Sequence, residues 1–383
     1  MAVKSLPAEF YSAFLSDADK ERKPSPIRGL YPLEARPGVI SLLAGKPNAT
    51  TFPLTSYGPT AGIPSLLEWV YDLQQREHGR KKGEGWGVSI GSGSQDVIYK
   101  AVATMVNPGD AVLIECPAYA GVLPMFQALH CDLIEVETDA QGIKSSSLRS
   151  ILQKWPENKP KPKVLYTVPY GCNPTGMTAT LDRRREVLAL AQEHNFIILE
   201  DDPYYFLYYG DAARYPSYFS LELEEPETAV ANLQTSSLTQ AIAFSLLDAW
   251  GYDGFKTHTE TVSRFYREKR DVFEVAMRRH LSGLAEWSTP EAGMFFASGP
   301  DAMCLRRFKL LLVKDSEEGD SESIIRTKAY ERGVLALPGT VFLPRGGKTA
   351  YVRASFSLLG EEEVEEAVKR LRETILEARA QAA

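Results

Sequence analysis

Cysteine and histidine are scarce in this sequence, and this scarcity excludes several kinds of site. The four cysteines, Cys116, Cys131, Cys172 and Cys304, are far apart, and only five histidines occur in 383 residues. Disulfide frameworks and structural zinc sites need several such residues at short spacings. We therefore expect neither a disulfide nor a metal site. A reducing, cytoplasmic location is the prediction that follows.

Long hydrophobic runs and an excess of positive charge are also missing. No stretch approaches the ~20 apolar residues of a membrane span, and the N-terminal segment lacks the apolar core of a secretory signal. The net charge of −7 argues against a broad surface for nucleic acid or anionic membrane. We expect a protein that acts on small molecules, without nucleic-acid or membrane partners.

What the chain does contain is an alternation of strand-like and helix-like segments. Its 383 residues, 44% of them hydrophobic, are enough for two domains with buried cores. Such an alternation predicts an α/β fold with a mainly parallel, doubly wound sheet. Strands are predicted at 86–90, 111–115, 133–137, 164–168 and 196–200, and helices at 63–77, 91–106, 118–129 and 181–195.

After Tyr205 this alternation stops, and a smaller α+β domain is predicted near the C-terminus. We expect an arm at 1–60 that joins the small domain, a large domain at 61–285 and a small domain at 286–383. The predicted elements are a loop at 206–235, helices at 236–250, 254–280, 321–332 and 361–380, and strands at 294–297, 308–313, 334–337 and 351–356.

The segment Gly91-Ser-Gly-Ser-Gln95 stands where a predicted helix begins. Its glycines let backbone N–H groups approach an anion, and the helix dipole adds about half a positive charge at that end. Ser94 and Gln95 can donate further hydrogen bonds. The segment therefore predicts a phosphate site, although a flexible loop with an ordinary serine cap also explains it.

Two further motifs follow predicted strands, Tyr170-Gly-Cys-Asn-Pro-Thr-Gly176 and Glu200-Asp-Asp-Pro-Tyr-Tyr205. In a doubly wound sheet, ligands bind beyond the carboxyl ends of the strands. A carboxylate there needs a positive partner, and a pyridinium nitrogen beside Asp202 meets this need. Asn173 and Tyr205 can bond a ring oxygen. Ordinary turns at Asn-Pro and Thr-Gly and core packing of the tyrosine are the alternatives.

With these motifs in place, the chain resembles the class I/II aminotransferases, fold-type I enzymes that use pyridoxal phosphate (PLP). Within that class it is similar to the kynurenine/2-aminoadipate and fungal aromatic amino acid aminotransferases. The resemblance implies a PLP-transferase fold, with a large domain built on a mainly parallel sheet and a smaller α+β domain. The segments that carry it are 24–28, 45–48, 57–62, 91–95, 173–176, 201–205, 293–295 and 351–356.

The resemblance also implies which residues contact the cofactor. Tyr57 would reach the phosphate of the neighbouring subunit, so the family implies a homodimer with shared active sites. The implied contacts are Ser94, Gln95 and Tyr57 at the phosphate, Tyr119 on the ring face, Asn173 and Tyr205 at the ring oxygen, and Asp202 at the pyridine nitrogen.

For the substrate, the resemblance implies that Arg353 binds the α-carboxylate through two hydrogen bonds, and Asn173 is a further candidate to donate to a substrate carboxylate. Gly45 would border the entrance, and Arg28 belongs to an arm segment that would line the side-chain pocket. The predicted reaction is transamination of an aromatic amino acid, 2-aminoadipate or kynurenine, with 2-oxoglutarate as the acceptor. Amino acids and 2-oxo acids are therefore the expected small-molecule partners.

The chain departs from the family after Tyr205. Family members carry a Ser-x-Ser-Lys motif, whose lysine holds the cofactor as a Schiff base, and then a Gly-x-Arg that grips the phosphate. Neither motif follows Tyr205, and the first lysine after it is Lys256. We therefore assign no catalytic lysine. A catalytically impaired PLP-binding homologue that acts as a non-catalytic dimer is the alternative to an active aminotransferase.

Two abrupt changes in the sequence accompany this departure. Between residues 222 and 231, at least a strand, a turn and much of a helix are missing relative to the family, on the order of 30 residues or more. Residues 296–307 split what the family has as one strand pair. Our hypothesis is that both changes come from splicing, as a lost exon and a retained intron fragment. A tryptic peptide of the native protein that crosses Glu227 to Asn232 as written would contradict it.

Overall fold

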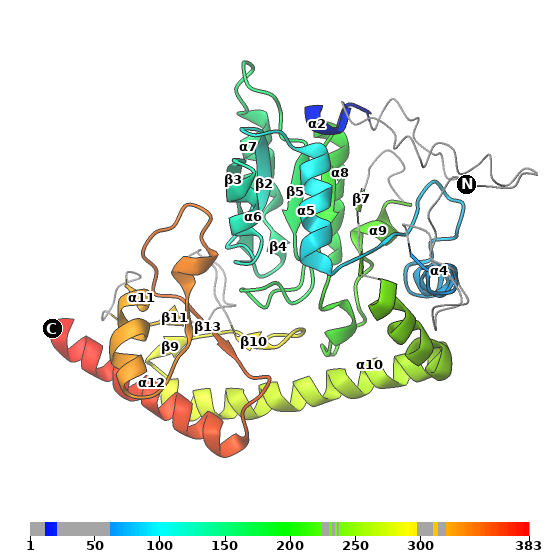
Figure 1. Cartoon of the computed structure of the whole chain (residues 1–383). Coiled ribbons are helices and arrows are strands. Elements are labelled where there is room, and N and C mark those ends of the chain that lie inside the picture. The colour runs from blue at the N-terminus through cyan, green and yellow to red at the C-terminus, as the bar shows by residue number, and fades with distance from the viewer. Residues whose placement is uncertain are drawn as a thin grey trace, which may run out of the picture.

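The computed structural model describes residues 12–20, 62–223, 230–231, 234–235, 237–296, 309–312 and 319–382. Figure 1 shows a sheet flanked by helices, with the long helix α10 (Ser237–Leu281) running beneath it. α10 leads into a smaller group of strands and helices, which α12 (Glu361–Ala382) crosses. The α/β fold class is thus confirmed, whereas the exact domain boundaries stay a prediction.

The remaining helices and all strands have the following bounds. The other helical segments are α2 (Asp17–Lys20), α4 (Pro64–His78), α5 (Ser94–Met105), α6 (Leu123–Ala128), α7 (Ser145–Gln153), α8 (Leu181–His194), the 3₁₀ turn η3 (Tyr205–Leu207), α9 (Tyr218–Leu221), α11 (Ser321–Ile324), the π-helical segment η4 (Ile325–Ala329) and the 3₁₀ turn η5 (Gly339–Phe342). The strands are β1 (Ile90–Gly91), β2 (Ala111–Cys116), β3 (Asp132–Asp139), β4 (Gly142–Ile143), β5 (Val164–Thr167), β6 (Ile197–Glu200), β7 (Val230–Ala231), β8 (Gln234–Thr235), β9 (Ala285–Glu286), β10 (Phe295–Phe296), β11 (Lys309–Leu310), β12 (Leu337–Pro338) and β13 (Val352–Ser355).

The large sheet has the strand order β4-β3-β2-β5-β6-β7. Neighbours from β3 to β7 run parallel, and β4 pairs antiparallel with β3. Leu165 of β5 lies opposite Leu113 of β2 and Ile198 of β6. Because parallel strands in register end at the same edge, the residues that follow β2, β5 and β6 come together there.

Successive side chains of these strands pack into separate cores on the two faces of the sheet. Ile114 packs in a cluster with Val102 of α5 and residues of α6. Its neighbour Leu113 packs in a second cluster with Val187 of α8 and residues of α7. Since helices cover both faces, the strands read as continuous apolar runs rather than alternating ones.

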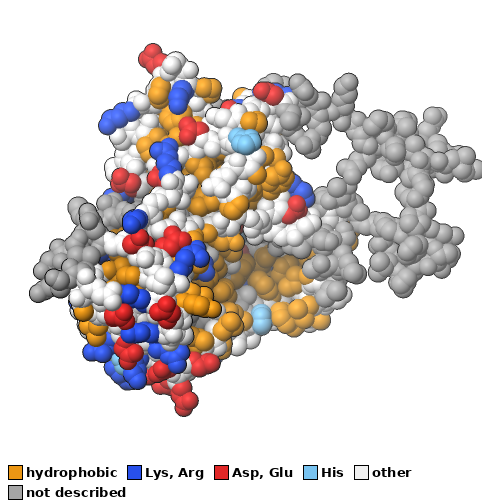
Figure 2. Space-filling view, turned by 60° about the vertical axis from the view of Figure 1, so that its left-hand side comes forward, with side chains coloured by type: hydrophobic (Ala, Val, Ile, Leu, Met, Phe, Trp, Pro, Cys, Tyr) orange, Lys and Arg blue, Asp and Glu red, His pale blue; other side chains and the backbone are white. Residues whose placement is uncertain are grey.

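The smaller part is built on the antiparallel sheet β10-β13-β12. Phe296 and Val352 of this sheet share a core with Met277 of α10 and Ile375 of α12. The rings of Phe273 and Phe296 stack with 5.4 Å between their centroids. Figure 2 shows positive and negative side chains interspersed over this region of the surface.

The segment that includes η5 connects the small part to the large sheet. The backbone N–H of Ala118, just after β2, donates to the Phe342 carbonyl at 2.9 Å. Arg345 Nη2 donates to the Leu133 carbonyl at 3.2 Å, and its backbone N–H donates to Glu135 Oε1 at 3.2 Å. These bonds place Phe342 beside the loop that follows β2.

Several predicted elements differ from the observed ones. The helix predicted at 118–129 begins only at Leu123, because residues 119–122 form a turn in which Val122 N–H donates to the Tyr119 carbonyl at 3.2 Å. The helices predicted at 236–250 and 254–280 form α10, which breaks at Gly251 with φ 62° and ψ −177°.

The prediction of a loop at 206–235 was wrong in part. This segment contains η3 and α9, and Ser217 caps α9 by accepting a hydrogen bond from Ser220 N–H at 3.1 Å. A single capped turn is too short to show a helical period. At the end of the predicted gap β7 pairs with β6, and after it β8 pairs with β1.

Candidate active site

The carboxyl edge of the large sheet brings the two predicted motifs together. β5 is followed by the loop that carries Asn173, and β6, its parallel neighbour, is followed by Asp202. Asn173 is buried in this edge. Parallel pairing thus places an amide and a carboxylate from two different loops at one end of the sheet, as the sequence predicts.

Arg353 reaches this edge from β13 in the small part of the molecule. Its Nη1 donates to Asn173 Oδ1 at 3.0 Å. The guanidinium carbon lies 4.1 Å from the ring centroid of Phe295 and 5.4 Å from that of Phe342. Arg353 Nε is buried and has no hydrogen-bond partner within the described residues. Burial lowers the pKa of Arg353, and the guanidinium remains charged.

Tyr204 joins this group, although the sequence analysis assigned it no role. Burial raises the pKa of Tyr204 to about 12, and a hydrogen bond with the Asn173 side chain opposes the shift. Electrostatic interactions with Tyr204 and Tyr119 raise the pKa of Arg353 and so oppose the effect of its burial. The consecutive tyrosines of Pro-Tyr-Tyr are the signal that more than one tyrosine was available at this strand end.

Asp202 is the buried acid of this edge. Its Oδ1 is inaccessible to solvent and has no hydrogen-bond partner within the part of the chain that the structure describes. Burial, and next the charge of Glu200, raise the pKa of Asp202 well above its usual range, while Arg184 opposes them. A positive ligand group at Oδ1 would remove much of this electrostatic cost.

Tyr205 lies among aromatic and positively charged side chains. Its ring contacts that of Tyr170 edge-on at 5.3 Å, and the Arg214 guanidinium lies over it at 4.5 Å. Burial raises the pKa of Tyr205 to about 12, and Arg214 opposes the shift. The charge of Asp202 also raises the pKa of Tyr205. That Tyr205 and Asn173 meet at one ring oxygen stays a prediction.

The predicted phosphate segment lies at the N-terminus of α5. Gly93 precedes the helix with φ 125°, a conformation that favours glycine, and Ser94 is the first helical residue. Ser94 and Gln95 are exposed. Gln95 Nε2 donates to the Gly121 carbonyl. The Tyr119 side chain folds back over Gly121, so Gln95 and Tyr119 lie at the same loop.

The remaining predicted contacts lie outside the described residues. These are Tyr57 for the phosphate, Gly45 for the entrance and Arg28 for the side-chain pocket.

Arg184 and Glu200 form a buried pair that the sequence analysis did not identify. Arg184 lies on α8 and is fully buried, with its Nη1 3.7 Å from Glu200 Oε1. It donates to the carbonyls of Ala179 at 3.0 Å and Pro169 at 3.1 Å. Glu200 in turn accepts hydrogen bonds from the backbone at the start of α9, including Tyr218 N–H at 3.0 Å. The pair therefore joins both ends of the loop that carries Asn173 to the end of β6 and the start of α9.

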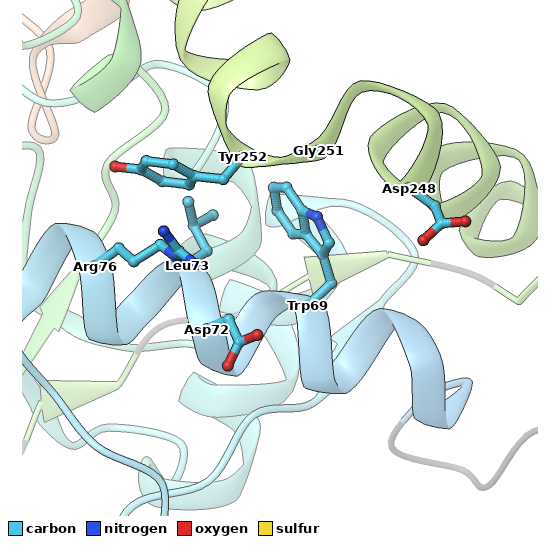
Figure 3. A pocket seen from close by; sticks show the side chains of 7 residues that line it. All are labelled: Trp69, Asp72, Leu73, Arg76, Asp248, Gly251 and Tyr252. Carbon is cyan, nitrogen blue, oxygen red and sulfur yellow. The ribbon is translucent and has the colours of Figure 1, made fainter.

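A cavity of ≈ 210 Å³ lies away from these residues, between α4 and α10. Figure 3 shows side chains from both helices facing it, including the Trp69 and Tyr252 rings. Asp72, Arg76 and Asp248 on its rim are exposed. Since the cavity takes in none of the predicted cofactor contacts, it is not the candidate active site.

No cluster of metal-ligating side chains occurs among residues that the structure describes. Every described helix is too short or too polar to cross a membrane.

Comparison with known proteins identifies the family. The profile of the family "Aminotransferase class I and II" matches residues 41–243. Aminotransferase tdiD of Emericella nidulans is 38% identical, over 91% of this chain and 92% of its own length. The chain belongs to the class I and II aminotransferases. The family resemblance drawn from the sequence motifs is thereby confirmed.

Two further proteins are similar to this aminotransferase over nearly its whole length. The mitochondrial kynurenine/alpha-aminoadipate aminotransferase of Mus musculus is 34% identical, over 96% of this chain and 99% of its own length. The kynurenine aminotransferase of Pyrococcus horikoshii, solved with PMP and with KYN and KYA, has a TM-score of 0.70 at 27% identity. That alignment covers 96% of this chain and 98% of the other. Large and small parts therefore follow a known aminotransferase fold.

Family membership implies PLP as the cofactor, and the buried polar atoms at the sheet edge fit such a group. A protonated ring nitrogen would donate to Asp202 Oδ1, which has no partner within the described ranges. A substrate carboxylate would accept from Arg353 Nε, which is buried without a partner in the same ranges. That the chain lacks the Schiff-base lysine stays a prediction from the sequence.

Proposed function

We propose that this aminotransferase transfers the α-amino group of an aromatic amino acid, 2-aminoadipate or kynurenine to 2-oxoglutarate. The observation that carries the proposal is the contact between Arg353 Nη1 and Asn173 Oδ1, with Arg353 Nε left to bond a ligand. Each proposed substrate has a carboxylate beside the reacting carbon. A planar guanidinium binds such a carboxylate through two parallel hydrogen bonds.

The rings around Arg353 support an aromatic or aminobenzoyl side chain in the substrate. Phe295 and Phe342 flank the guanidinium, and the rings of Tyr204 and Phe295 meet edge-on at 6.5 Å. Aromatic rings prefer such edge-on and offset contacts with one another. The names of the mouse and Pyrococcus relatives support kynurenine and 2-aminoadipate as substrates.

The residues of the sheet edge have distinct proposed roles toward PLP. Bound PLP supplies an electron sink for the reaction. Asp202 would hold a proton on the ring nitrogen, since Oδ1 of its buried carboxyl group has no other hydrogen-bond partner among the described residues. Tyr119 would cover a ring face, and Ser94 and Gln95 would donate to the phosphate at the start of α5.

We also propose a homodimer with shared active sites and a cytoplasmic location. The family supports the dimer, and Tyr57, which would reach the other subunit, lies outside the described residues. The free thiols of Cys116, Cys131 and Cys172 support a reducing compartment. Light scattering of the purified protein measures its mass. Cell fractionation is needed for the location because the mouse relative is named mitochondrial.

A second candidate function is PLP binding without turnover. Lys256, the first lysine after Tyr205, has its Nζ 3.0 Å from Glu77 Oε1. The same carboxylate accepts from the Tyr252 hydroxyl at 2.6 Å and pairs with Arg214 at 3.3 Å. A lysine side chain engaged in this ion pair is not free to attack a carbonyl group.

One experiment separates the two candidates. The purified protein is titrated with PLP while its absorbance is recorded, and glutamate formation from kynurenine and 2-oxoglutarate is then measured. We expect PLP binding and glutamate formation. PLP binding without glutamate would support the second candidate, and no binding of PLP would contradict both. Borohydride reduction followed by peptide mapping identifies any lysine that has reacted with the cofactor.

A further inference from the structure

Glu115 is a buried acid beside the candidate site that has no role in the proposed function. It is the penultimate residue of β2 and has no accessible surface. Its Oε1 accepts from Val168 N–H at 2.9 Å, and its Oε2 accepts from the Thr167 hydroxyl at 2.8 Å. The Cys172 thiol lies 3.2 Å from Oε1. Among the described residues, no lysine or arginine forms an ion pair with Glu115.

A carboxyl group at this position is costly for folding. The rest of β2 consists of apolar residues, and an apolar side chain at position 115 would avoid the loss of hydration. Burial raises the pKa of Glu115 to about 7, and the charge of Asp201 adds to this shift. The other titratable groups that interact with it are Tyr166, Cys172, Cys116 and Tyr218. No cation offsets the cost within the described part of the chain, so another benefit is needed to explain the residue.

The hydrogen bonds of Glu115 all go to one stretch of the chain, the end of β5 at Thr167 and the loop at 168–177 that follows it. This loop is also closed by its own backbone: Gly176 N–H donates to the Cys172 carbonyl at 2.6 Å, and Cys172 N–H donates to the Met177 carbonyl at 2.8 Å. Glu115 therefore joins the end of β5 and the loop that follows it to β2, a central strand of the sheet. Asn173, the partner of Arg353, directly follows Cys172.

We propose that Glu115 is a positioning residue, which fixes the loop at 168–177 so that Asn173 holds Arg353 in the geometry that binds the substrate carboxylate. The role in substrate binding rests on the proposed function, whereas the role of Glu115 in fixing the loop does not depend on it. Thr167 and Val168 anchor the start of the loop and Cys172 anchors its middle, so the loss of the carboxyl group releases both points at once.

The first test measures backbone hydrogen exchange in the protein without ligands. Glu115→Ala removes the acceptors, whereas Glu115→Gln keeps an acceptor for Val168 N–H and nearly the same shape. Leu152→Ala is the matched control, because Leu152 is a buried core residue of α7 whose cluster includes no residue of the loop at 168–177. We expect about tenfold faster exchange in peptides of the loop for Glu115→Ala, with rates near wild type for Glu115→Gln. Unchanged exchange in Glu115→Ala would overturn the proposal.

The second test measures the affinity for 2-oxoglutarate by calorimetry. We expect Glu115→Ala to weaken binding about tenfold, Glu115→Gln to restore most of the affinity, and Leu152→Ala to lower stability without changing affinity. Equal losses of affinity in Glu115→Ala and Leu152→Ala would overturn the proposal, because a general loss of stability would then explain them. If the wild type does not bind 2-oxoglutarate, the proposed function is wrong. The exchange result then decides whether Glu115 positions the loop.

Discussion

At the level of single residues, Asp202 lies buried with an unpartnered oxygen, and this burial raises its pKa well above the usual range. A raised pKa in the folded state means that the ionised group costs stability. The folded protein therefore has its full stability below the pKa of Asp202 in the unfolded chain, near 3.8. It loses stability as the pH rises through the higher pKa of Asp202 in the folded state.

Asp202→Asn removes this cost, so we expect the free energy of unfolding without PLP to rise by about 1–2 kcal/mol at pH 8. PLP binding should weaken at least about tenfold, because the ring nitrogen loses its anionic partner. Urea unfolding and an absorbance titration measure the two effects. Equal PLP affinity in variant and wild type would show that Asp202 does not meet the ring nitrogen.

Arg353 is the second residue whose role is directly testable. Arg353→Gln removes the charge and the planar pair of donors that faces the carboxylate, and it leaves Asn173 Oδ1 without a strong donor. We expect the dissociation constant for 2-oxoglutarate to rise about 10- to 100-fold, as for the loss of a charge-assisted hydrogen bond.

Arg149→Gln is the control for this change of charge, since Arg149 forms an exposed ion pair with Glu193 at 3.3 Å. Calorimetry with 2-oxoglutarate should give the same affinity for this variant and the wild type. If both variants bind as the wild type does, the carboxylate lies elsewhere in the molecule.

At the level of elements, α10 shows how one residue divides a long helix. Gly251 has φ 62° and ψ −177°, and a Cβ added there would meet no atom within 4 Å. A side chain at this position would therefore strain the backbone conformation without causing a steric clash. The segment of α10 before this break packs against α4, and the two helices enclose the cavity of Figure 3.

Gly251→Ala should lower the free energy of unfolding by about 1 kcal/mol, because an alanine is strained at positive φ. Gly87→Ala is the matched control, since Gly87 does not have positive φ and its nearest neighbour to an added Cβ is Tyr71 at 3.9 Å. Thermal unfolding of both variants measures the difference. Equal stabilities would mean that α10 straightens in the variant.

At the level of the whole molecule, His78 joins elements that are far apart in the sequence. It ends α4, its Nδ1 lies 2.8 Å from Ser217 Oγ at the start of α9, and its ring lies 4.8 Å from that of Tyr205. Burial lowers the pKa of His78 to about 4. The lowered pKa means that the folded state resists protonation between pH 6.5 and 4, where the unfolded chain takes up a proton.

The wild type should therefore lose stability as the pH falls through this window, by about 2 kcal/mol between pH 7.5 and pH 5 from this residue alone. His78→Gln should be less stable at pH 7.5 but should lose correspondingly less on acidification. Urea unfolding at both pH values measures this. His258→Gln is the control, because His258 is exposed. The same pH slope in His78→Gln and wild type would contradict the assignment.

The fold and the chemical class of the site follow from short stretches of sequence. The alternation of apolar strands and amphipathic helices predicts the parallel sheet because each pattern depends only on neighbouring residues. The motifs around Asn173 and Asp202 predict the ligand edge because parallel strands end together. Their family resemblance identifies the aminotransferase class, which the profile match at 41–243 confirms.

The contacts that depend on long-range packing were not predictable in this way. Arg353 and Asn173 are 180 positions apart, and the small part must fold against the sheet before they meet. Tyr204 and Tyr205 are neighbours in the sequence, yet Tyr204 bonds Asn173 and Tyr205 packs against Tyr170 and Arg214. Glu115 appears in the sequence only as a charge within an apolar strand. Its bonds to the loop arise because β2 and β5 pair in register, which local sequence patterns do not specify.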